Sequence, residues 1–289
     1  MSPQRGRAVA VVTDSTAALL PAFAQEADVA VVPLHVHVGE SITLEGVGTD
    51  EATAAVLRGD RVTTSQPTPE AFAERYAALA AAGAREIVSV HLSGELSGTV
   101  HAAALAAHRA PVPVRVVDSR VVGMGLGFAA LSAARVAASG ASAADVEGAA
   151  LATARSASGF FLVDSLEHLR RGGRLSLAAS AVGTALGMKP LLTLRDGRVA
   201  VLAKVRTRAA AVTRLTALVQ EEAARCARPR VALHYLGDDA DVRAIAADLV
   251  ERTGLEVLVA PVGAVLGAHV GPGLVAAFVV DDPMEGRRA

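Results

Sequence analysis

Residues 267–273 place a single imidazole, His269, among three glycines and directly before an apolar segment, 274–280, that predicts a final strand. Glycines let backbone amides approach a ligand closely, and a histidine can donate a hydrogen bond to an anion. The same composition is typical of an ordinary Gly/Pro turn. The segment therefore indicates an anion-binding site only in combination with other polar segments that could bind the same anion.

Four further polar segments lie next to predicted strands and helices, where open α/β sheets bind their ligands. Their hydroxyls and the free amides at a helix start suit a carboxylate or a phosphate. Such residues are also ordinary helix caps, and we favour that interpretation for Ser15 and Ser119. Thr64 and Ser97 sit among more polar groups than a cap requires, so we interpret them as functional. The segments are 13–16, 63–67, 93–99 and 118–119.

The elements that position these segments alternate in the first half of the chain between short β-branched runs and alanine-rich stretches. This pattern predicts helices around a mostly parallel sheet. Thr68 followed by Pro69 is typical of a helix start. Apolar residues Phe72, Tyr76 and Leu79 would share one face of that helix. Predicted strands cover 9–12, 30–38, 86–91 and 114–117, and another helix is expected to begin near residue 49.

The pattern changes beyond residue 158. The pair Asp196-Gly197 between two β-branched runs is a strong hairpin signal. We therefore predict an α/β protein of two domains. Residues 1–157 would form a mostly parallel sheet with helices on both faces, and residues 158–289 an α+β domain. The second domain is expected to contain a strand at 160–163, a helix at 207–227, a strand at 231–236 and a helix at 238–251.

The composition narrows the class of function. Hydrophobic residues make up 52% of the 289 residues but aromatic residues only 3%, so Ala, Val and Leu would line any cavity. A formal net charge of -1 offers no basic field for nucleic acid or an anionic membrane. No apolar stretch approaches the ~20 residues of a membrane span, and the N-terminal one is too short for a signal peptide. With Cys226 as the single cysteine, we expect a soluble, cytoplasmic protein.

Six motifs occur in a fixed order: Thr13-Asp14-Ser15-Thr16, Thr64-Ser65-Gln66-Pro67, Leu96-Ser97-Gly98-Thr99, Gly172-Gly173-Arg174-Leu175-Ser176, Lys189-Pro190-Leu191-Leu192 and His269-Val270-Gly271-Pro272-Gly273. Together they resemble the bacterial DegV family, the fatty-acid-binding subunits of fatty acid kinase systems. The resemblance spans residues 9–280. It implies two α/β domains that close on one buried acyl chain, with the ligand between them.

The resemblance also implies roles for individual residues. Thr64, Ser97 and His269 match the positions that hold the carboxylate. Arg174 and Arg206 match arginines near the opening, which are associated with the phosphoryl group or with docking of the kinase. The supporting residues of the headgroup site would be Ser15, Ser65, Gly98, Thr99 and Gly271.

The implied function is that of a carrier. The chain would bind a single long-chain fatty acid in a buried tunnel and present it to the catalytic subunit of a fatty acid kinase. It would need no cofactor or metal and would have no catalytic residue of its own. Two departures from the family pattern, Gly94 after Ser93 and Val100 in place of a tyrosine, put the acyl-chain preference in doubt.

A serine hydrolase is the main alternative, with Ser97, His269 and Asp118 as a triad. Against it, Ser97 lies in Leu-Ser-Gly-Thr rather than in a Gly-x-Ser-x-Gly elbow. Glycines in 123–127 suggest a dinucleotide loop, but the fingerprint is incomplete and close helix packing is favoured. The histidines at 35 and 37 share a strand face without further metal ligands.

Overall fold

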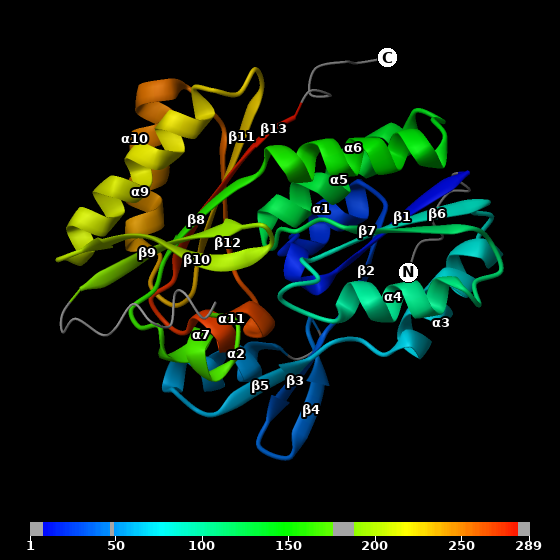
Figure 1. Ribbon diagram of the computed structural model, residues 1–289, viewed down its shortest axis with the longest axis horizontal. Helices are drawn as coiled ribbons and strands as arrows, with labels where there is room; N and C mark the ends of the chain where they lie inside the picture. The colour runs from blue at the N-terminus through cyan, green and yellow to red at the C-terminus, as the bar shows by residue number, and fades with distance from the viewer. Residues whose placement is uncertain (1–7, 47–48, 176–187, 283–289) are drawn as a thin grey trace. The chain divides into compact units, whose positions relative to one another are not determined.

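The computed structural model describes residues 8–46, 49–175 and 188–282 (Figure 1). These residues form two compact units. Unit 1 contains residues 8–35 and 65–155, and unit 2 contains residues 36–64 and 156–282. The predicted domain ranges, 1–157 and 158–289, differ from these units chiefly in residues 36–64, which pack with the second half of the chain.

Unit 1 is built on a four-stranded sheet in which all neighbouring strands are parallel. The strands, in spatial order, are β2 (Val29–Val32), β1 (Val9–Asp14), β6 (Glu86–His91) and β7 (Val114–Asp118). Helices α3 (Pro69–Ala81) and α4 (Thr99–Ala107) cover one face, and α5 (Met124–Ala138) and α6 (Ala143–Ser156) cover the other (Figure 1). The turn η1 (Ser15–Ala17) and helix α1 (Pro21–Glu26) connect β1 to β2. The predicted parallel sheet with helices on both faces is confirmed.

In helix α3, both the start of the helix and its buried face follow from the local sequence. Thr68 Oγ1 accepts a hydrogen bond from the Ala71 N–H at 3.2 Å, and proline occupies the first helical position. Phe72, Tyr76 and Leu79 are all buried, in one cluster with Ile87 of β6. Burial of each such side chain contributes about 1.5–3 kcal/mol, so this face fixes α3 on the sheet as its spacing predicts.

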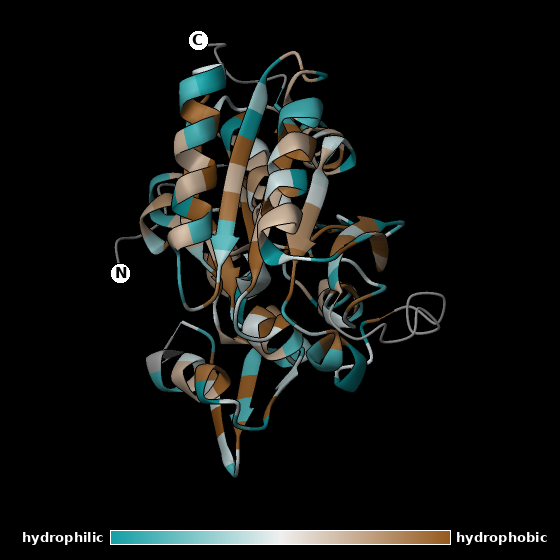
Figure 2. Ribbon diagram, turned by 90° about the vertical axis from the view of Figure 1, so that its left-hand side faces the viewer, coloured by the Kyte–Doolittle hydropathy of each residue, from teal (hydrophilic) through white to brown (hydrophobic). Residues whose placement is uncertain are grey.

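Unit 2 contains a six-stranded sheet that is antiparallel except for one pair. The strands, in spatial order, are β10 (Arg198–Val205), β9 (Lys189–Arg195), β8 (Ser158–Leu162), β13 (Val275–Asp281), β11 (Pro229–Tyr235) and β12 (Val257–Pro261). Helices α9 (Arg208–Ala223) and α10 (Ala240–Thr253) show mixed hydrophilic and hydrophobic residues along their length (Figure 2). Leu215 and Leu249, one from each helix, lie in the same buried cluster as Val279 of the sheet.

The hairpin between β9 and β10 confirms the Asp196-Gly197 signal. The two strands are antiparallel, and Arg195 pairs with Arg198 across the two-residue turn. Both turn residues have positive φ, 50° for Asp196 and 80° for Gly197. A two-residue turn with both φ angles positive matches the right-handed twist of the flanking strands.

Residues 36–64 contain structure that the sequence patterns did not predict. The single strand expected over 30–38 is two strands, β2 and β3 (His35–Val38), which belong to different sheets. Pro33 lies between them and lacks the N–H that a continuing ladder needs. Strand β3 pairs with β4 (Ser41–Leu44) and β5 (Val62–Ser65) in a three-stranded sheet, and α2 (Thr49–Arg58) begins where it was expected.

The segment 267–273 is also more regular than its composition predicts. Helix α11 (Ala264–Val270) covers its first four residues, so His269 lies in the last turn of a helix and not in an open loop. Gly271, with φ 75°, ends the helix. The helix formers in 264–266 outweigh the glycines because Gly267 costs only about 1 kcal/mol within a helix. A second short helix, α7 (Glu167–Arg171), ends directly before Gly172 and Gly173.

A chain of buried polar side chains crosses the core of unit 1. The Tyr76 hydroxyl donates to Ser89 Oγ at 2.9 Å, and Ser89 Oγ lies 2.7 Å from His91 Nε2. His91 Nδ1 lies 3.0 Å from Asp14 Oδ2. All four residues are fully buried, so each depends on the others for its hydrogen bonds. Burial and the bond to Ser89 act in opposite directions on Tyr76, and burial prevails and raises its pKa to about 12.

We expect Asp14→Asn to destabilise the protein by about 3 kcal/mol, because an amide turns one acceptor oxygen into a donor that faces N–H groups. Asp60→Asn is the matched control, since the Asp60 carboxylate is exposed and bonds only to Arg58 among the described residues. Urea unfolding of both variants measures the difference. Equal, small losses would show that the buried chain is not a stabilising network.

Candidate functional site

Two of the three predicted carboxylate-binding side chains are in contact within unit 2. His269 Nε2 lies 2.8 Å from Oγ1 of Thr64, which is a residue of strand β5 rather than of a turn. The helix that carries His269 is held at its other end by Glu45, whose Oε1 accepts a hydrogen bond from the Val265 N–H at 2.8 Å. A carboxylate at a helix N-terminus is favourable. Residues 36–64 thus supply both Thr64 and the anchor of α11.

At the C-terminal ends of α7 and α11, a histidine of each helix packs against the glycine that ends the other helix. A Cβ at Gly172 would come within 2.5 Å of His269 Nδ1, so the His269 ring occupies that space. A Cβ at Gly271 would come within 2.5 Å of His168 Cδ2, so the His168 ring lies against α11 in the same way. Each imidazole therefore requires a glycine on the opposite helix. Gly271 is predicted as a supporting headgroup residue. Glycine is required at this position because His168 leaves no room for a Cβ and because its φ is positive.

The surroundings of His269 keep its imidazole neutral. Burial is the largest of three causes, with the nearby Arg174 guanidinium and the His168 ring, that together lower the pKa of His269 to about 4. Among the described residues, the buried Nδ1 has no hydrogen-bond partner. We therefore assign the ring proton to Nε2, which leaves only a lone pair at Nδ1 on the side of Gly172.

This assignment fixes the direction of the contact with Thr64. A protonated Nε2 donates to Thr64 Oγ1, and the Thr64 hydroxyl hydrogen then remains to donate to another acceptor. His269 acts on an anion through Thr64 in this arrangement. The predicted direct contact between His269 and a carboxylate would need the ring to release Thr64.

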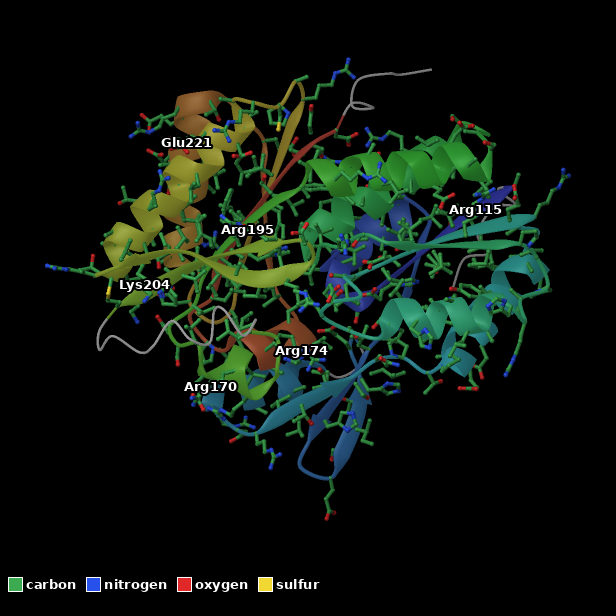
Figure 3. All side chains as sticks on the ribbon, in the orientation of Figure 1. Arg115, Arg170, Arg174, Arg195, Lys204 and Glu221 are labelled. Atoms are coloured by element: carbon green, nitrogen blue, oxygen red, sulfur yellow. The ribbon has the colours of Figure 1, made fainter. Side chains whose placement is uncertain are left out.

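The two predicted arginines are in different surroundings. Arg174 donates from its guanidinium to the Gly172 carbonyl at 2.5 Å and lies close enough to His269 to lower its pKa. Arg206 is exposed and directly follows the last residue of β10. Figure 3 shows Arg174 near the short helices, whereas Lys204, two residues before Arg206, lies at the far end of β10. Ser176, the last residue of the Arg174 motif, lies outside the described residues.

The third predicted carboxylate-binding residue, Ser97, belongs to unit 1. Its Oγ lies 2.9 Å from Thr99 Oγ1 and accepts the Thr99 N–H at 3.4 Å. If Oγ accepts both bonds, its own hydrogen is available to a ligand. A Cβ at Gly98 would come within 2.1 Å of Gln66 Oε1, so glycine is required there for packing. Ser65, a predicted supporting residue, is exposed.

The polar turns that we interpret as caps have structural roles in unit 1. Ser15 Oγ accepts the Leu34 N–H at 3.1 Å and so joins the turn after β1 to the end of β2. Ser119 Oγ donates to the His91 carbonyl at 2.6 Å. Asp118 Oδ1 accepts the N–H groups of Gly94 and Arg120. The bond to Leu34 leaves the hydroxyl hydrogen of Ser15 unused, so its supporting role at the headgroup stays a prediction.

The contacts also bear on the alternative functions. In a hydrolase triad the histidine Nδ1 donates to the aspartate, but His269 Nδ1 has no partner among the described residues. Ser97 and Asp118 of this alternative belong to unit 1 and His269 to unit 2, so the triad stays a prediction. A Cβ at Gly127 would come within 2.7 Å of the Ala17 carbonyl, which supports packing over a dinucleotide loop.

Residues 8–46, 49–175 and 188–282 contain neither a cluster of metal ligands nor a membrane-spanning helix. No group of three or more His, Cys, Asp or Glu side chains is arranged to hold a metal ion. No helix in these ranges has the length and apolar character to cross a membrane. His35 instead places its Nδ1 3.3 Å from the Gln66 carbonyl.

Two residues at the site were not identified from the sequence. His168 lies four residues before Gly172, a spacing that brings it to the same end of α7, but the basic run around it has the composition of an ordinary helix end. Glu45 reaches α11 from a segment that precedes it by 220 positions in the chain. Neither residue belongs to a local motif, so only the tertiary structure reveals them.

We expect Gly172→Ala to displace the His269 ring, because the new Cβ would come within 2.5 Å of Nδ1. Overpacking of this kind costs about 1–3 kcal/mol. The control is Gly148→Ala in α6, where a Cβ meets no atom within 4 Å. Thermal unfolding should show a loss for Gly172→Ala alone, which His269→Ala should partly restore. Equal melting temperatures of Gly172→Ala and Gly148→Ala would contradict the packing of His269 against Gly172.

The lowered pKa of His269 predicts a pH dependence of stability. Between its ordinary pKa of 6.5 and about 4, the unfolded chain binds a proton that the folded chain does not. Stability should therefore fall as the pH drops through this window, by about 3 kcal/mol at its acid end. His269→Gln should flatten urea-unfolding free energies measured from pH 7 to 4, and exposed His108→Gln should not. A parallel curve for His269→Gln and the unmodified chain would refute the neutral state.

Comparison with known sequences gives the family. The model of the DegV family matches residues 8–282. A DegV domain-containing protein of Streptomyces coelicolor is 46% identical over 278 residues, which cover 94% of this chain and 98% of that protein. A DegV domain-containing protein of Deinococcus radiodurans is 36% identical over 271 residues, with coverage of 92% and 96%.

Solved structures agree with this result. A DegV family protein from Thermus thermophilus, described as binding fatty acid, has a TM-score of 0.86 and 35% identity, covering 94% of this chain and 99% of its own. DegV from Bacillus subtilis, described as a fatty acid binding protein, has a TM-score of 0.86 and 29% identity with the same coverage. The match of sequence and fold over nearly the whole length shows that this chain belongs to the DegV family.

Proposed function

We propose that this chain binds a single long-chain fatty acid, with its carboxylate held by Thr64, Ser97 and His269, the last acting through Thr64. The observation that carries the proposal is the contact of His269 Nε2 with Thr64 Oγ1, which leaves a hydroxyl hydrogen to donate beside the Arg174 cation. Fatty acid binding by the family members from Thermus thermophilus and Bacillus subtilis supports the same ligand class.

The tail and the headgroup of the fatty acid contribute differently to the binding free energy. Burial of each methylene is worth ~0.8 kcal/mol, so a long acyl chain provides on the order of 10 kcal/mol before the costs of binding. Hydrogen bonds to a charged carboxylate add about 1.5–3 kcal/mol. The tail would therefore supply affinity, and the hydroxyls would fix which end of the ligand meets the partner. Covering the tail in a buried tunnel would also keep a poorly soluble lipid out of water.

We further propose that the chain performs no chemistry itself and presents the carboxylate to the catalytic subunit of a fatty acid kinase. Arg174, next to His269, is placed to meet the charge of a phosphoryl group on the carboxylate. Arg206, exposed after β10, suits contact with the kinase. The acyl-chain preference would be set partly by Gly94 and Val100, where the sequence departs from the family pattern.

The first experiment is organic extraction of the purified protein, followed by mass spectrometry of the extract. We expect one fatty acid per chain. A protein that carries no fatty acid and fails to take up added palmitate would overturn the proposal. Labelling by a covalent serine probe, lost in Ser97→Ala, would point to the hydrolase instead.

Variants at the hydroxyls test the headgroup. Thr64→Val and Ser97→Ala should each weaken palmitate binding about tenfold without abolishing it, because each removes one bond to a charged group while the tail stays buried. Thr213→Val is the control, since this hydroxyl donates only to the Ala209 carbonyl on an exposed part of α9. Fluorescent fatty acid displacement measures all three. No change in either site variant would remove these residues from the site.

A further inference from the structure

The side-chain amide of Gln66 lies against the turn that carries Ser97. A Cβ at Gly98 would meet Gln66 Oε1 first and would come within 3.2 Å of Nε2. The amide therefore rests on the backbone of the residue that directly follows Ser97. Gln66 belongs to the motif 64–67 and Gly98 to the motif 96–99, so this contact joins, within unit 1, two motifs that are separate in the chain.

The backbone around Gln66 holds the side chain in this place. The Gln66 carbonyl accepts a hydrogen bond from His35 Nδ1 at 3.3 Å when that nitrogen carries the ring proton. Pro67 follows, and a residue before proline is restricted to extended conformations. On the other side of the contact, any side chain at position 98 would displace the amide. The amide is thus positioned from both sides before a ligand binds.

The Gln66 amide has unused hydrogen-bonding capacity. Within residues 8–46, 49–175 and 188–282 its side chain forms no hydrogen bond, and the residue is exposed. Gln220, by contrast, donates from Nε2 to Asp248 at 3.2 Å. Because Oε1 is the amide atom nearest to Gly98, the NH2 group lies farther from that backbone and keeps both of its hydrogens for donation.

A bound carboxylate needs more donors than the two hydroxyls of the proposed site supply. Its oxygens accept up to about four hydrogen bonds, and acceptors left without a donor are costly once the group is removed from water. Thr64 and Ser97 have one hydroxyl hydrogen each. The amide on Gly98 offers two further N–H groups in the turn that already carries Ser97.

We propose that the Gln66 amide donates to the fatty acid carboxylate beside Ser97 and so selects a charged headgroup. This inference rests on the proposed function and adds a residue to its site. Hydrogen bonds to an ionised acceptor are roughly twice as strong as those to a neutral one. An alcohol has a single oxygen, which the hydroxyls alone can satisfy, so it gains little from the amide. Gln66 is thus a determinant of headgroup specificity.

The test compares two ligands that share one tail, palmitate and hexadecan-1-ol. Gln66→Met keeps the length of the side chain but removes its donors, so it should weaken palmitate binding about tenfold and hexadecanol binding less than twofold. Gln66→Glu, measured at pH 8, should weaken palmitate binding still further, because like charges repel. Gln25→Met, a change of an exposed glutamine of α1, should alter neither affinity. Displacement of a fluorescent fatty acid, calibrated for each variant, gives both affinities.

The remaining outcomes separate the role of Gln66 from the proposed function. Equal losses for the two ligands, or no loss for either, in a Gln66→Met variant that melts like the unmodified protein would show a packing role alone and overturn the inference. Undiminished palmitate binding by Gln66→Glu would overturn it as well. Both results leave fatty acid binding intact. If the unmodified protein binds neither ligand, the proposed function itself fails, and the role of Gln66 fails with it.

The composition allows a direct measurement on the unmodified protein, which does not depend on the folding of a variant. The chain contains no asparagine and four glutamines, so its side-chain NH2 groups give four pairs of ¹H–¹⁵N signals. The Gln66 pair, assigned through its backbone signals, should shift on addition of palmitate and much less on addition of hexadecan-1-ol. Equal shifts with the two ligands, or no shift with palmitate, would contradict a hydrogen bond from this amide to the carboxylate.

Discussion

The fully buried carboxylate of Asp14 is the constraint on which the turns of unit 1 depend. A charge in that position is tolerated only if its lone pairs are all used. Oδ1 accepts the N–H and the hydroxyl of Thr16, and Oδ2 accepts the Leu92 N–H and faces His91. One side chain thus ties the end of β1 to the end of β6. The turn that carries Ser97 starts one residue after Leu92, so its position follows from this anchor.

In unit 2, partly exposed ion pairs and close packing against glycines hold the turns in place. The Arg208 guanidinium donates to Asp164 at 2.9 Å and to the Gly273 carbonyl at 3.1 Å, which holds the turn after α11. Such partly exposed pairs are individually weak. The exact fit comes from packing, because the rings of His168 and His269 each fill the place of a glycine Cβ on the other helix. Shape, more than charge, therefore fixes the imidazoles.

The sequence predicts well those elements whose cause is local. The Asp196-Gly197 hairpin and helix α3, with its Thr68 cap, each carry the reason for their structure within a few residues. Strands β4 and β5 were not predicted, and β3 was predicted as one strand with β2, because the pairing partners and the unit of β3 to β5 are set by distant contacts. At the site, Thr64 and His269 were found from motifs. Glu45 and His168 were not, because their roles depend on contacts with α11 across more than a hundred positions of sequence.

In the cluster around His269, one residue orients the Thr64 hydroxyl and another supplies positive charge. A protonated His269 would attract a carboxylate strongly, but its buried charge would be unpaired whenever the ligand is absent. A buried neutral ring instead orients Thr64 by a hydrogen bond, and this bond strengthens when the Thr64 hydroxyl in turn donates to an anion. The positive charge stands apart on Arg174, two residues beyond the glycine that receives the His269 ring. Under the proposed function, the residue that orients the ligand and the residue that neutralises its charge would be different, so the protein would hold the same tail while the charge at the headgroup changes.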